Sequence, residues 1–225
     1  MTQPDAETTV VLHDYWRSSA SYRVRIALAL KGIAYRRIPV DLLSGDQRGP
    51  ENLRVNPQGL VPTLEIDGHR LTQSLAILEY LEETRPEPAL LPAQPVVRAL
   101  VRSVALAIAC DIHPVSNLTV LARVAALAGP EARARWNSDN IRDGLVGVEA
   151  LIARMGRGGP FVAGPAPGFA DCALIPQLYN ARRWSVGFDD LPRLCEIEAA
   201  AAAHPAFQAA LPENFVPATA ARPVA

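Results

Sequence analysis

A proline-rich segment at residues 85–92 divides the chain into two parts with different hydrophobic patterns. It reads Arg-Pro-Glu-Pro-Ala-Leu-Leu-Pro, with three prolines in seven positions. Proline fixes φ and lacks a backbone N–H, so such a run interrupts helices and strands and is typical of a domain boundary. The 225 residues can form one large domain or two small ones. The change of pattern favours two, at residues 8–86 and 93–215.

The first part alternates between strand and helix patterns, which predicts a compact α/β domain. Its strands are short apolar runs, and an Asp-Gly pair marks the turn of a hairpin. Serines before the helices and a glycine after the first helix are usual capping residues. The expected elements are strands at 10–15 and 35–40 around a helix at 20–30, then a hairpin of strands at 61–66 and 69–72 and a helix from Ser74.

The second part is rich in alanine and shows hardly any strand pattern, which predicts an all-helical domain. A break rich in glycine and proline is expected at 156–168, and a loose tail after Pro212. The expected helices are one or two within 96–127 and one each at 131–155, 169–184 and 191–203.

Composition argues against several classes of function. Hydrophobic residues make up 49% of the chain and charged residues 20%, as in a folded globular protein and unlike a disordered one. The 22 basic and 23 acidic side chains leave a net charge of −1, so we expect no basic surface for nucleic acid. A basic pocket would have to be local and would suit a small anion.

Targeting and redox features favour a cytoplasmic protein. The most apolar stretch, 99–110, contains Arg102 and is shorter than the roughly 20 residues that span a membrane. Residues 1–9 are polar and resemble neither a signal peptide nor a basic transit peptide. The three cysteines lie far apart, and the histidines show no metal-ligand spacing, which argues against disulfides and against a metal site.

Residues 17–21, Arg-Ser-Ser-Ala-Ser, lie between an expected strand and an expected helix. Hydroxyl groups beside the N–H groups of a helix N-terminus favour an anion, because the donors and the helix dipole both point toward it. Ser18 and Ser19 are therefore candidates for binding an anion. Ser19 could equally serve only as the helix cap.

Two further elements could bind a peptide-like ligand. Pro62 precedes a strand, so it belongs at a sheet edge or in a cis turn. A cis bond would leave the Val61 backbone to pair with an extended ligand, although most X–Pro bonds are trans. Gln73 and Ser74 place an amide and a hydroxyl at a second helix N-terminus, which suits a carboxylate, although Ser74 is also an ordinary cap.

Together these elements resemble the thioredoxin-like N-terminal domain of cytosolic glutathione transferases. Residues 18–28, Ser-Ser-Ala-Ser-Tyr-Arg-Val-Arg-Ile-Ala-Leu, are similar to the signature of the zeta class, the maleylacetoacetate isomerases. The resemblance covers residues 10–212, with each motif in the family's order. Further similar motifs are Asn56-Pro57-Gln58, Val61-Pro62-Thr63-Leu64, Gln73-Ser74-Leu75-Ala76-Ile77, Glu79-Tyr80-Leu81-Glu82-Glu83, Asp111-Ile112-His113-Pro114, Asn117-Leu118-Thr119-Val120-Leu121, Ala170-Asp171-Cys172-Ala173-Leu174-Ile175-Pro176-Gln177 and Asn180-Ala181-Arg182-Arg183-Trp184.

Two positions depart from the family pattern. Ala20 stands where the zeta signature usually has cysteine, so no protein thiol lies there and disulfide exchange is not expected. Gly168 stands where a threonine usually caps the helix that begins near Asp171. The resemblance therefore predicts a cap weaker by a few tenths of a kcal/mol, since glycine is a tolerated N-cap.

The resemblance implies glutathione as cosubstrate and no metal. The peptide part of glutathione would pair with the backbone ahead of a cis-proline, and its γ-glutamyl carboxylate would bind at the start of the second helix. The thiol would point at the serine pair. The glutathione-binding residues implied in this way are Ser18, Ser19, Gln47, Val61, Pro62, Gln73, Ser74, His113, Asn117 and Thr119.

The implied reaction converts maleylacetoacetate to fumarylacetoacetate by reversible addition of the glutathione thiolate to the cis double bond. The substrate is a small dianionic maleyl keto acid, so cationic side chains should face the thiol. Arg17, Ser18 and Ser19 are the expected catalytic residues. Arg17 and Arg183, the latter in an Asn-Ala-x-Arg motif, are expected to bind the substrate carboxylates, although Arg182 and Arg183 could simply form an exposed helix face.

Several alternatives remain open. Maleylpyruvate isomerase of gentisate breakdown shares the fold and mechanism, but relatives of that type carry arginines where Leu118 and Thr119 stand. This difference favours maleylacetoacetate and aromatic amino acid catabolism. The zeta class can also conjugate or dehalogenate small α-halo acids. A noncatalytic binding protein with this fold is the alternative from a different class. By family analogy, we expect a homodimer.

Overall fold

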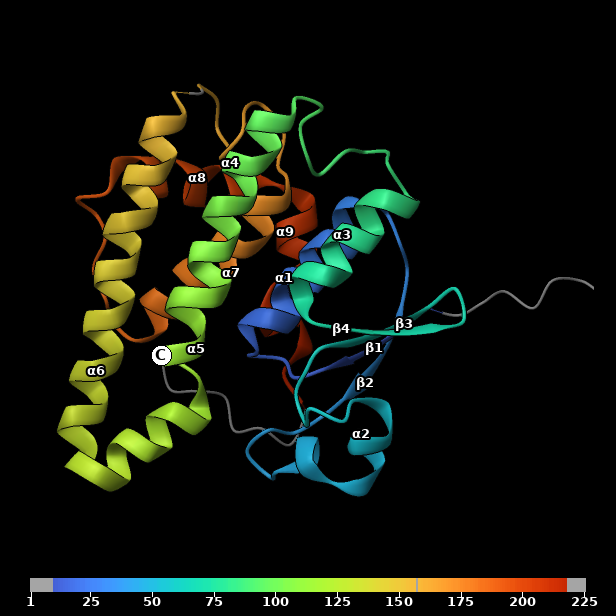
Figure 1. Ribbon diagram of the computed structural model, residues 1–225, viewed down its shortest axis with the longest axis vertical. Coiled ribbons are helices and arrows are strands. Elements are labelled where there is room, and N and C mark those ends of the chain that lie inside the picture. Colours follow the sequence, from blue (N-terminus) through green and yellow to red (C-terminus); the bar gives the residue numbers. More distant parts are fainter. Residues whose placement is uncertain (1–9, 157, 218–225) are drawn as a thin grey trace, which may run out of the picture. The chain divides into compact units, whose positions relative to one another are not determined.

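The computed structural model describes residues 10–156 and 158–217 (Figure 1). Residues 1–9, where no targeting signal is expected, lie outside this range. Contacts group the described residues into two compact units, 10–88 with 205–217, and 89–204. The boundary after residue 88 falls in the proline-rich segment. The grouping of 205–217 with the first unit differs from the expected extent of the helical domain, 93–215. Of the loose tail expected after Pro212, residues 213–217 belong to this unit, and residues 218–225 lie outside the described range.

A mixed four-stranded sheet in the order β2-β1-β3-β4 forms the centre of the first unit, which confirms the predicted α/β class. β1 is parallel to β2 and antiparallel to β3, and β3 and β4 form the predicted hairpin. Its turn residues Asp67 and Gly68 both have positive φ, which an Asp-Gly pair tolerates. The strands are β1 Val11–Asp14, β2 Arg36–Pro39, β3 Thr63–Ile66 and β4 His69–Thr72.

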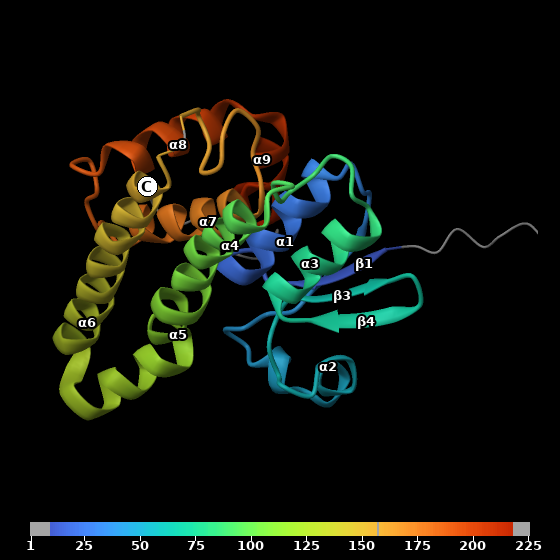
Figure 2. The same ribbon diagram turned by 45° about the horizontal axis from the view of Figure 1, so that its top comes forward.

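Helices cover both faces of this sheet. α1 and α3 lie on one face and α2 lies on the other, and α9 packs beside α1 (Figure 2). The apolar side chains Leu12, Leu64, Ile26 and Ile77 are fully buried in the unit's core. α2 lies where the sequence analysis expected a loop. The helices are α1 Ser19–Leu30, α2 Pro50–Val55, α3 Ser74–Thr84 and α9 Pro205–Ala210, with 3-10 turns η1 Asp46–Arg48 and η3 Pro212–Phe215.

Lys31 joins the C-terminal ends of α1 and α3. Its Nζ donates to Glu82 Oε2 at 2.9 Å and to the carbonyl oxygens of Arg85 and Pro88 at 2.6 and 2.7 Å. A cation is favoured at helix C-termini, where carbonyl groups lack partners within the helix. Lys31 therefore holds the first residues of the proline-rich segment against the first unit.

The second unit is helical, as predicted. α6 is interrupted at Gly129, where φ is 88°, and Pro130 follows, so it comprises two helices that meet between the helices expected within 96–127 and at 131–155. Within residues 10–156 and 158–217, no helix is long and apolar enough to cross a membrane. The elements are α4 Pro95–Leu106, the π-helix η2 Ala107–Ile112, α5 His113–Val115, α6 Leu118–Met155, α7 Phe169–Arg183 and α8 Pro192–Ala203.

The π-helix η2 was not predicted, and it packs closely against α6. A Cβ atom at Gly144 of α6 would lie 2.4 Å from Ile112 Cγ1, so only glycine permits this approach. π-Helical turns are rare and are frequently found at functional sites. Here the turn directly precedes His113, one of the predicted site residues.

Candidate active site

The predicted site segments of the first unit meet at one end of the sheet. The register pairs His13 of β1 with Thr63 of β3, and Thr63 with Thr72 of β4. The segment that follows β1, the Val61–Pro62 bond before β3 and Gln73 after β4 therefore lie at the same end. The structure brings together three elements that the sequence analysis identified separately.

The N-terminus of α1 presents hydroxyl and N–H groups at this end. Ser18, not Ser19, is the N-cap, and its Oγ accepts a hydrogen bond from the Ser21 amide at 3.2 Å. Ser19 is the first helical residue, so its amide is one of the donors that have no acceptor within the helix. The first turn contains no acidic residue. This helix end is suited to an anion that the chain itself does not supply.

Arg17 lies beside the serines and is partly buried. Its Nη2 donates to Tyr15 Oη at 3.2 Å, and its guanidinium lies 4.8 Å from the centre of the Trp16 ring. Its Nε is buried and has no hydrogen-bond partner among the described residues. A buried donor without an acceptor is unfavourable, so an anionic ligand would satisfy this group.

The start of α3 forms a second polar corner. Gln73 has φ 66° and ψ 109°, a sparsely populated conformation that is typical of functional sites. Its Nε2 donates to Gln58 Oε1 at 3.0 Å. Ser74 is buried, and its Oγ accepts from Arg23 Nη1 at 3.1 Å. Because this bond occupies a lone pair of Oγ, the hydroxyl hydrogen remains to donate to a carboxylate.

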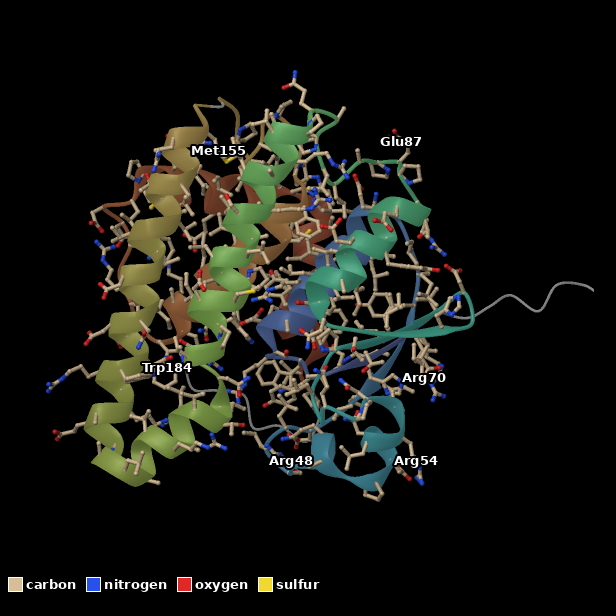
Figure 3. All side chains as sticks on the ribbon, viewed as in Figure 1. Arg48, Arg54, Arg70, Glu87, Met155 and Trp184 are labelled. Carbon is tan, nitrogen blue, oxygen red and sulfur yellow. The ribbon has the colours of Figure 1, made fainter. Side chains whose placement is uncertain are left out.

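Gln47 and Val61 complete the set in the first unit. Gln47 lies in η1, and its side-chain Oε1 is buried with no hydrogen-bond partner in the described part of the chain. Its backbone carbonyl accepts from Asn52 Nδ2 at 2.9 Å. The neighbouring Arg48 and Arg54 are exposed on η1 and α2 (Figure 3). The Val61–Pro62 bond is cis, as the family resemblance predicted.

Three predicted site residues of the second unit lie around α5. His113 begins α5 directly after η2. Asn117 is the N-cap of α6, and its Oδ1 accepts from the Thr119 amide at 3.1 Å. Asn117 and Thr119 thus have a structural role as a helix cap, whatever they bind.

Arg182 and Arg183, at the end of α7, have different environments. Arg182 forms ion pairs of 2.9 Å with Asp189 and with Glu198, and the hydrogen bonds that it donates to Glu198 and to Asp189 raise its pKa further above the usual value. Arg183 Nη2 donates to Asn180 Oδ1 at 3.1 Å. Trp184, which follows at the end of α7, is labelled in Figure 3. Arg182 is therefore held in a structural network, and Arg183 is held by Asn180 of the same motif.

Asp171 orders the start of α7. Its Oδ2 accepts from the Gly168 amide at 2.9 Å and its Oδ1 from the Val162 amide at 3.0 Å. Burial raises the pKa of this carboxyl from 3.8 to about 6. Gly168 is the N-cap of α7 and offers no side-chain acceptor, and the weaker cap expected at this position stays a prediction.

The sequence analysis missed two arginines, Arg23 and Arg25, that support the site from inside α1. Both are buried, at 2% and 0% exposure. The available signal was the presence of two arginines in a short apolar helix without acidic residues. It also missed a cavity of about 420 Å³ between η2 and α6, but none of the predicted site residues lines it. Over the residues that the structure describes, no group of three or more His, Cys, Asp or Glu side chains could hold a metal ion.

Comparison with known proteins gives consistent matches. A family model described as glutathione S-transferase, N-terminal domain, matches residues 17–84. Maleylacetoacetate isomerase of Rhizobium meliloti (strain 1021) is 54% identical over 209 residues, which are 92% of this chain and 98% of that protein. The crystal structure of maleylacetoacetate isomerase from Anaeromyxobacter dehalogenans 2CP-1 with bound GSH is 42% identical, with a TM-score of 0.83 and coverage of 91% and 95%. A bacterial zeta-class maleylpyruvate isomerase is 38% identical, with a TM-score of 0.89 and coverage of 93% and 100%.

Proposed function

The chain belongs to the maleylacetoacetate isomerases, the zeta class of the glutathione transferase family, and from this premise we propose that it converts maleylacetoacetate to fumarylacetoacetate with glutathione as cosubstrate. The observation that carries the proposal is the N-terminus of α1. It combines two serines, a helix end without an acidic residue and a buried Arg17 Nε that lacks an acceptor among the described residues.

The polar groups of the first unit fit a tripeptide that carries a thiol and two carboxylates. Ser74 and Gln73 offer a hydroxyl and an amide at the start of α3, which suits the γ-glutamyl carboxylate. Gln47 is half-buried, and its side-chain Nε2 can donate to the carboxylate of the glycyl end. The cis bond places Val61 just before β3, where its backbone can pair with the peptide.

The start of α1 is sufficient to ionise a thiol at neutral pH. A free cysteine-type thiol has a pKa of about 8.5, and lowering it by about two units requires about 2.7 kcal/mol in favour of the thiolate. A helix N-terminus contributes at most about 2 kcal/mol, and a hydrogen bond to a charged group about 1.5–3 kcal/mol. The hydroxyl of Ser18 or Ser19 and the helix end together cover this requirement.

Bound glutathione supplies the thiolate that adds reversibly to the cis double bond. The chain's own residues bind and orient glutathione and the substrate. Ser18 and Ser19 donate to the sulfur, and Arg17 holds a carboxylate of the substrate next to it. We assign the second carboxylate to Arg183 on the family resemblance, since Arg183 stands at the arginine of the Asn-Ala-x-Arg motif.

We further propose that the enzyme acts as a homodimer in the cytoplasm, in aromatic amino acid catabolism. The support is the family itself, together with Leu118 and Thr119 at positions where maleylpyruvate isomerases are expected to carry arginines. Light scattering during size-exclusion chromatography tests the dimer, and a monomer at micromolar concentration would contradict it.

The decisive experiment follows the loss of the cis enone absorbance for a maleylacetoacetate analogue and for maleylpyruvate, each with and without glutathione. We expect turnover that requires glutathione and is faster with the maleylacetoacetate analogue. A faster rate with maleylpyruvate would assign the enzyme to gentisate breakdown. Binding of glutathione without turnover of either compound would refute the isomerase and leave a transferase of α-halo acids or a binding protein.

A further inference from the structure

Arg25 connects the end of β1 and the segment after it with the end of α9, which is distant in the sequence. Its guanidinium is completely buried, and its Nη1 donates to both carboxylate oxygens of Asp14, at 2.7 and 2.9 Å. Its Nη2 donates to the Trp16 carbonyl at 2.9 Å and its Nε to the Ala210 carbonyl at 3.1 Å. One side chain on α1 thus bonds the end of β1, the segment after β1 and the end of α9.

Two of these bonds fix the segment that carries the proposed thiol site. Asp14 is the last residue of β1, and Ser18 is the N-cap of α1, so only residues 15–17 lie between the two elements. The Ser18 amide also donates to the Tyr15 carbonyl at 2.9 Å, which closes a turn. Arg25 of α1 thus holds Asp14 and the Trp16 carbonyl, which precede Ser18, and α1 itself follows Ser18. The position of Ser18 is therefore fixed by the segment before it and by the helix after it.

The bond from Arg25 to the Ala210 carbonyl involves the C-terminal part of the first unit. We call this part, residues 205–215, the C-terminal strap. Phe215 of this strap places its ring 4.7 Å from the Arg25 guanidinium and 5.4 Å from that of Arg37. Arg37 Nη1 donates to the Phe215 carbonyl at 3.0 Å, and its Nε donates to Asp14 Oδ2 at 2.8 Å. The strap therefore covers the cluster of Asp14, Arg25 and Arg37.

Within the cluster, the pair of Asp14 and Arg25 is shielded from water, whereas the Arg37 side chain is 20% exposed. The side chains of Asp14 and Arg25 are both 0% exposed. Burial also raises the pKa of the nearby Tyr35 hydroxyl to about 12, with smaller effects from Arg25, Asp14 and Arg37. In such surroundings charge pairs are strong when complete, and removing one partner is strongly unfavourable.

We propose that Arg25 is a positioning residue for the Ser18–Ser19 site and that the C-terminal strap holds the segment 15–18 in place through it. The effect on catalysis rests on the function proposed above, whereas the effect on this segment does not. Lysine cannot replace Arg25, because a single ammonium group cannot reach Asp14, the Trp16 carbonyl and the Ala210 carbonyl as the planar guanidinium does.

The first test measures amide hydrogen exchange in the full-length protein without any ligand, for Arg25→Lys and for the milder Phe215→Leu. Phe215→Leu removes the ring but keeps the backbone carbonyl that Arg37 binds. We expect the Ser18 amide to exchange at least tenfold faster in Arg25→Lys and about threefold faster in Phe215→Leu. Ile66→Ala is the matched control, because Ile66 is a buried residue at the opposite end of β3.

Exchange at Ser18 within twofold of the wild type in both variants would overturn the proposal. An equal increase in Ile66→Ala would also overturn it, because the increase would then report only a general loss of stability. Global stability is followed in parallel by thermal unfolding, so an unfolded Arg25→Lys protein leaves Phe215→Leu to decide.

The second test adds glutathione and substrate. We expect kcat to fall about 10- to 100-fold in Arg25→Lys, since small displacements of reacting groups have effects of this size, with a weaker thiolate absorbance of bound glutathione. Unchanged kcat in a variant whose Ser18 amide exchanges faster would overturn the catalytic part of the proposal. Absence of turnover in the wild type would refute the proposed function alone, because hydrogen exchange is read without substrate.

Discussion

The N-termini of α1 and α7 differ in the groups that face their unpaired amides. Each helix begins with amide groups that have no acceptor within the helix. At α7 the chain provides the anion itself, because Asp171 accepts from the Gly168 and Val162 amides. At α1 the first turn carries serines and no acidic residue.

The difference separates a structural helix end from one that can bind a ligand. The carboxylate of Asp171 is fully buried and occupied by backbone donors. The first turn of α1 carries only hydroxyl groups in place of this carboxylate, so an external anion such as a thiolate can bind there.

The largest expected effect comes from giving α1 an anion of its own. Ser19→Asp should lower kcat/KM at least about 10³-fold, or about 4 kcal/mol, because a fixed carboxylate repels the thiolate. Thermal stability should not fall, since an acid in the first turn stabilises a helix by about 0.3–1 kcal/mol. Steady-state kinetics and the thiolate absorbance of bound glutathione measure the effect.

The matched control is Ser19→Asn, which removes the hydroxyl without adding a charge. Its side-chain amide can still donate, so the fall in kcat should stay below the about 10²–10³-fold that loss of a donor to a developing anion typically costs. If the Asp and Asn variants were equally active, charge at this helix end would not matter and the comparison with α7 would fail.

The next effect concerns pH and Asp171. Its pKa is higher in the folded protein, about 6, than the reference value of 3.8, so the folded state binds this proton more tightly. The free energy of unfolding should therefore fall by about 3 kcal/mol from this group as pH rises from about 4 to 6. Urea unfolding at several pH values should show that the free energy of unfolding of the wild type falls over this range relative to that of Asp171→Asn.

An exposed carboxylate in the same unit provides the control for this pH series. Asp143 lies exposed on α6, so Asp143→Asn makes the same chemical change at a position that folding does not bury. A difference between wild type and Asp171→Asn that stays constant from pH 4 to 6 would show that Asp171 does not titrate there.

A smaller effect is expected at the cap of α7. A Cβ atom at Gly168 would lie 2.5 Å from the Leu90 carbonyl oxygen, a backbone atom that cannot easily move. Gly168→Ser should therefore destabilise the protein by about 1–3 kcal/mol, although serine is the better N-cap in general. Chemical unfolding measures this change. Gly187→Ala is the control, because no described atom lies within 4 Å of its added Cβ. A Gly168→Ser protein more stable than the wild type would show that side-chain capping outweighs the close contact with Leu90.

The smallest effect tests the start of α3. Arg23→Met removes the donor to Ser74 Oγ and should weaken glutathione binding about tenfold, or about 1.4 kcal/mol. With saturating glutathione, kcat should change little, because the thiol site at α1 is intact. Titration calorimetry measures the affinity, and Arg23→Lys should recover part of it. Unaltered affinity in Arg23→Met would show that the bond to Ser74 does not orient its hydroxyl for the ligand.

The elements that could be predicted from the sequence depend on local patterns. Short apolar runs and the Asp67-Gly68 turn were enough for the strands, and Gly129-Pro130 for the break in α6. The serine pair could be recognised because helix caps have a local signature. The cis bond before Pro62 required the family resemblance, since most X–Pro bonds are trans.

The unpredicted features depend on contacts between distant residues. The bond from Arg25 to Ala210 joins positions 185 apart and ends on a backbone carbonyl, which leaves no trace in side-chain composition. The bond from Arg23 to Ser74 spans 51 positions. The π-helix η2 and its contact at Gly144 likewise follow from packing between two helices, which hydrophobic periodicity alone does not encode.

The return of residues 205–217 to the first unit also sets an order of events during synthesis. More than a hundred residues, Ala89–His204, leave the ribosome between the two parts of that unit. At about 5–20 residues per second this takes about 5–25 s, during which Asp14, Arg25 and Arg37 have no strap to cover them. We expect the nascent helical unit to fold before the unit whose translation began first.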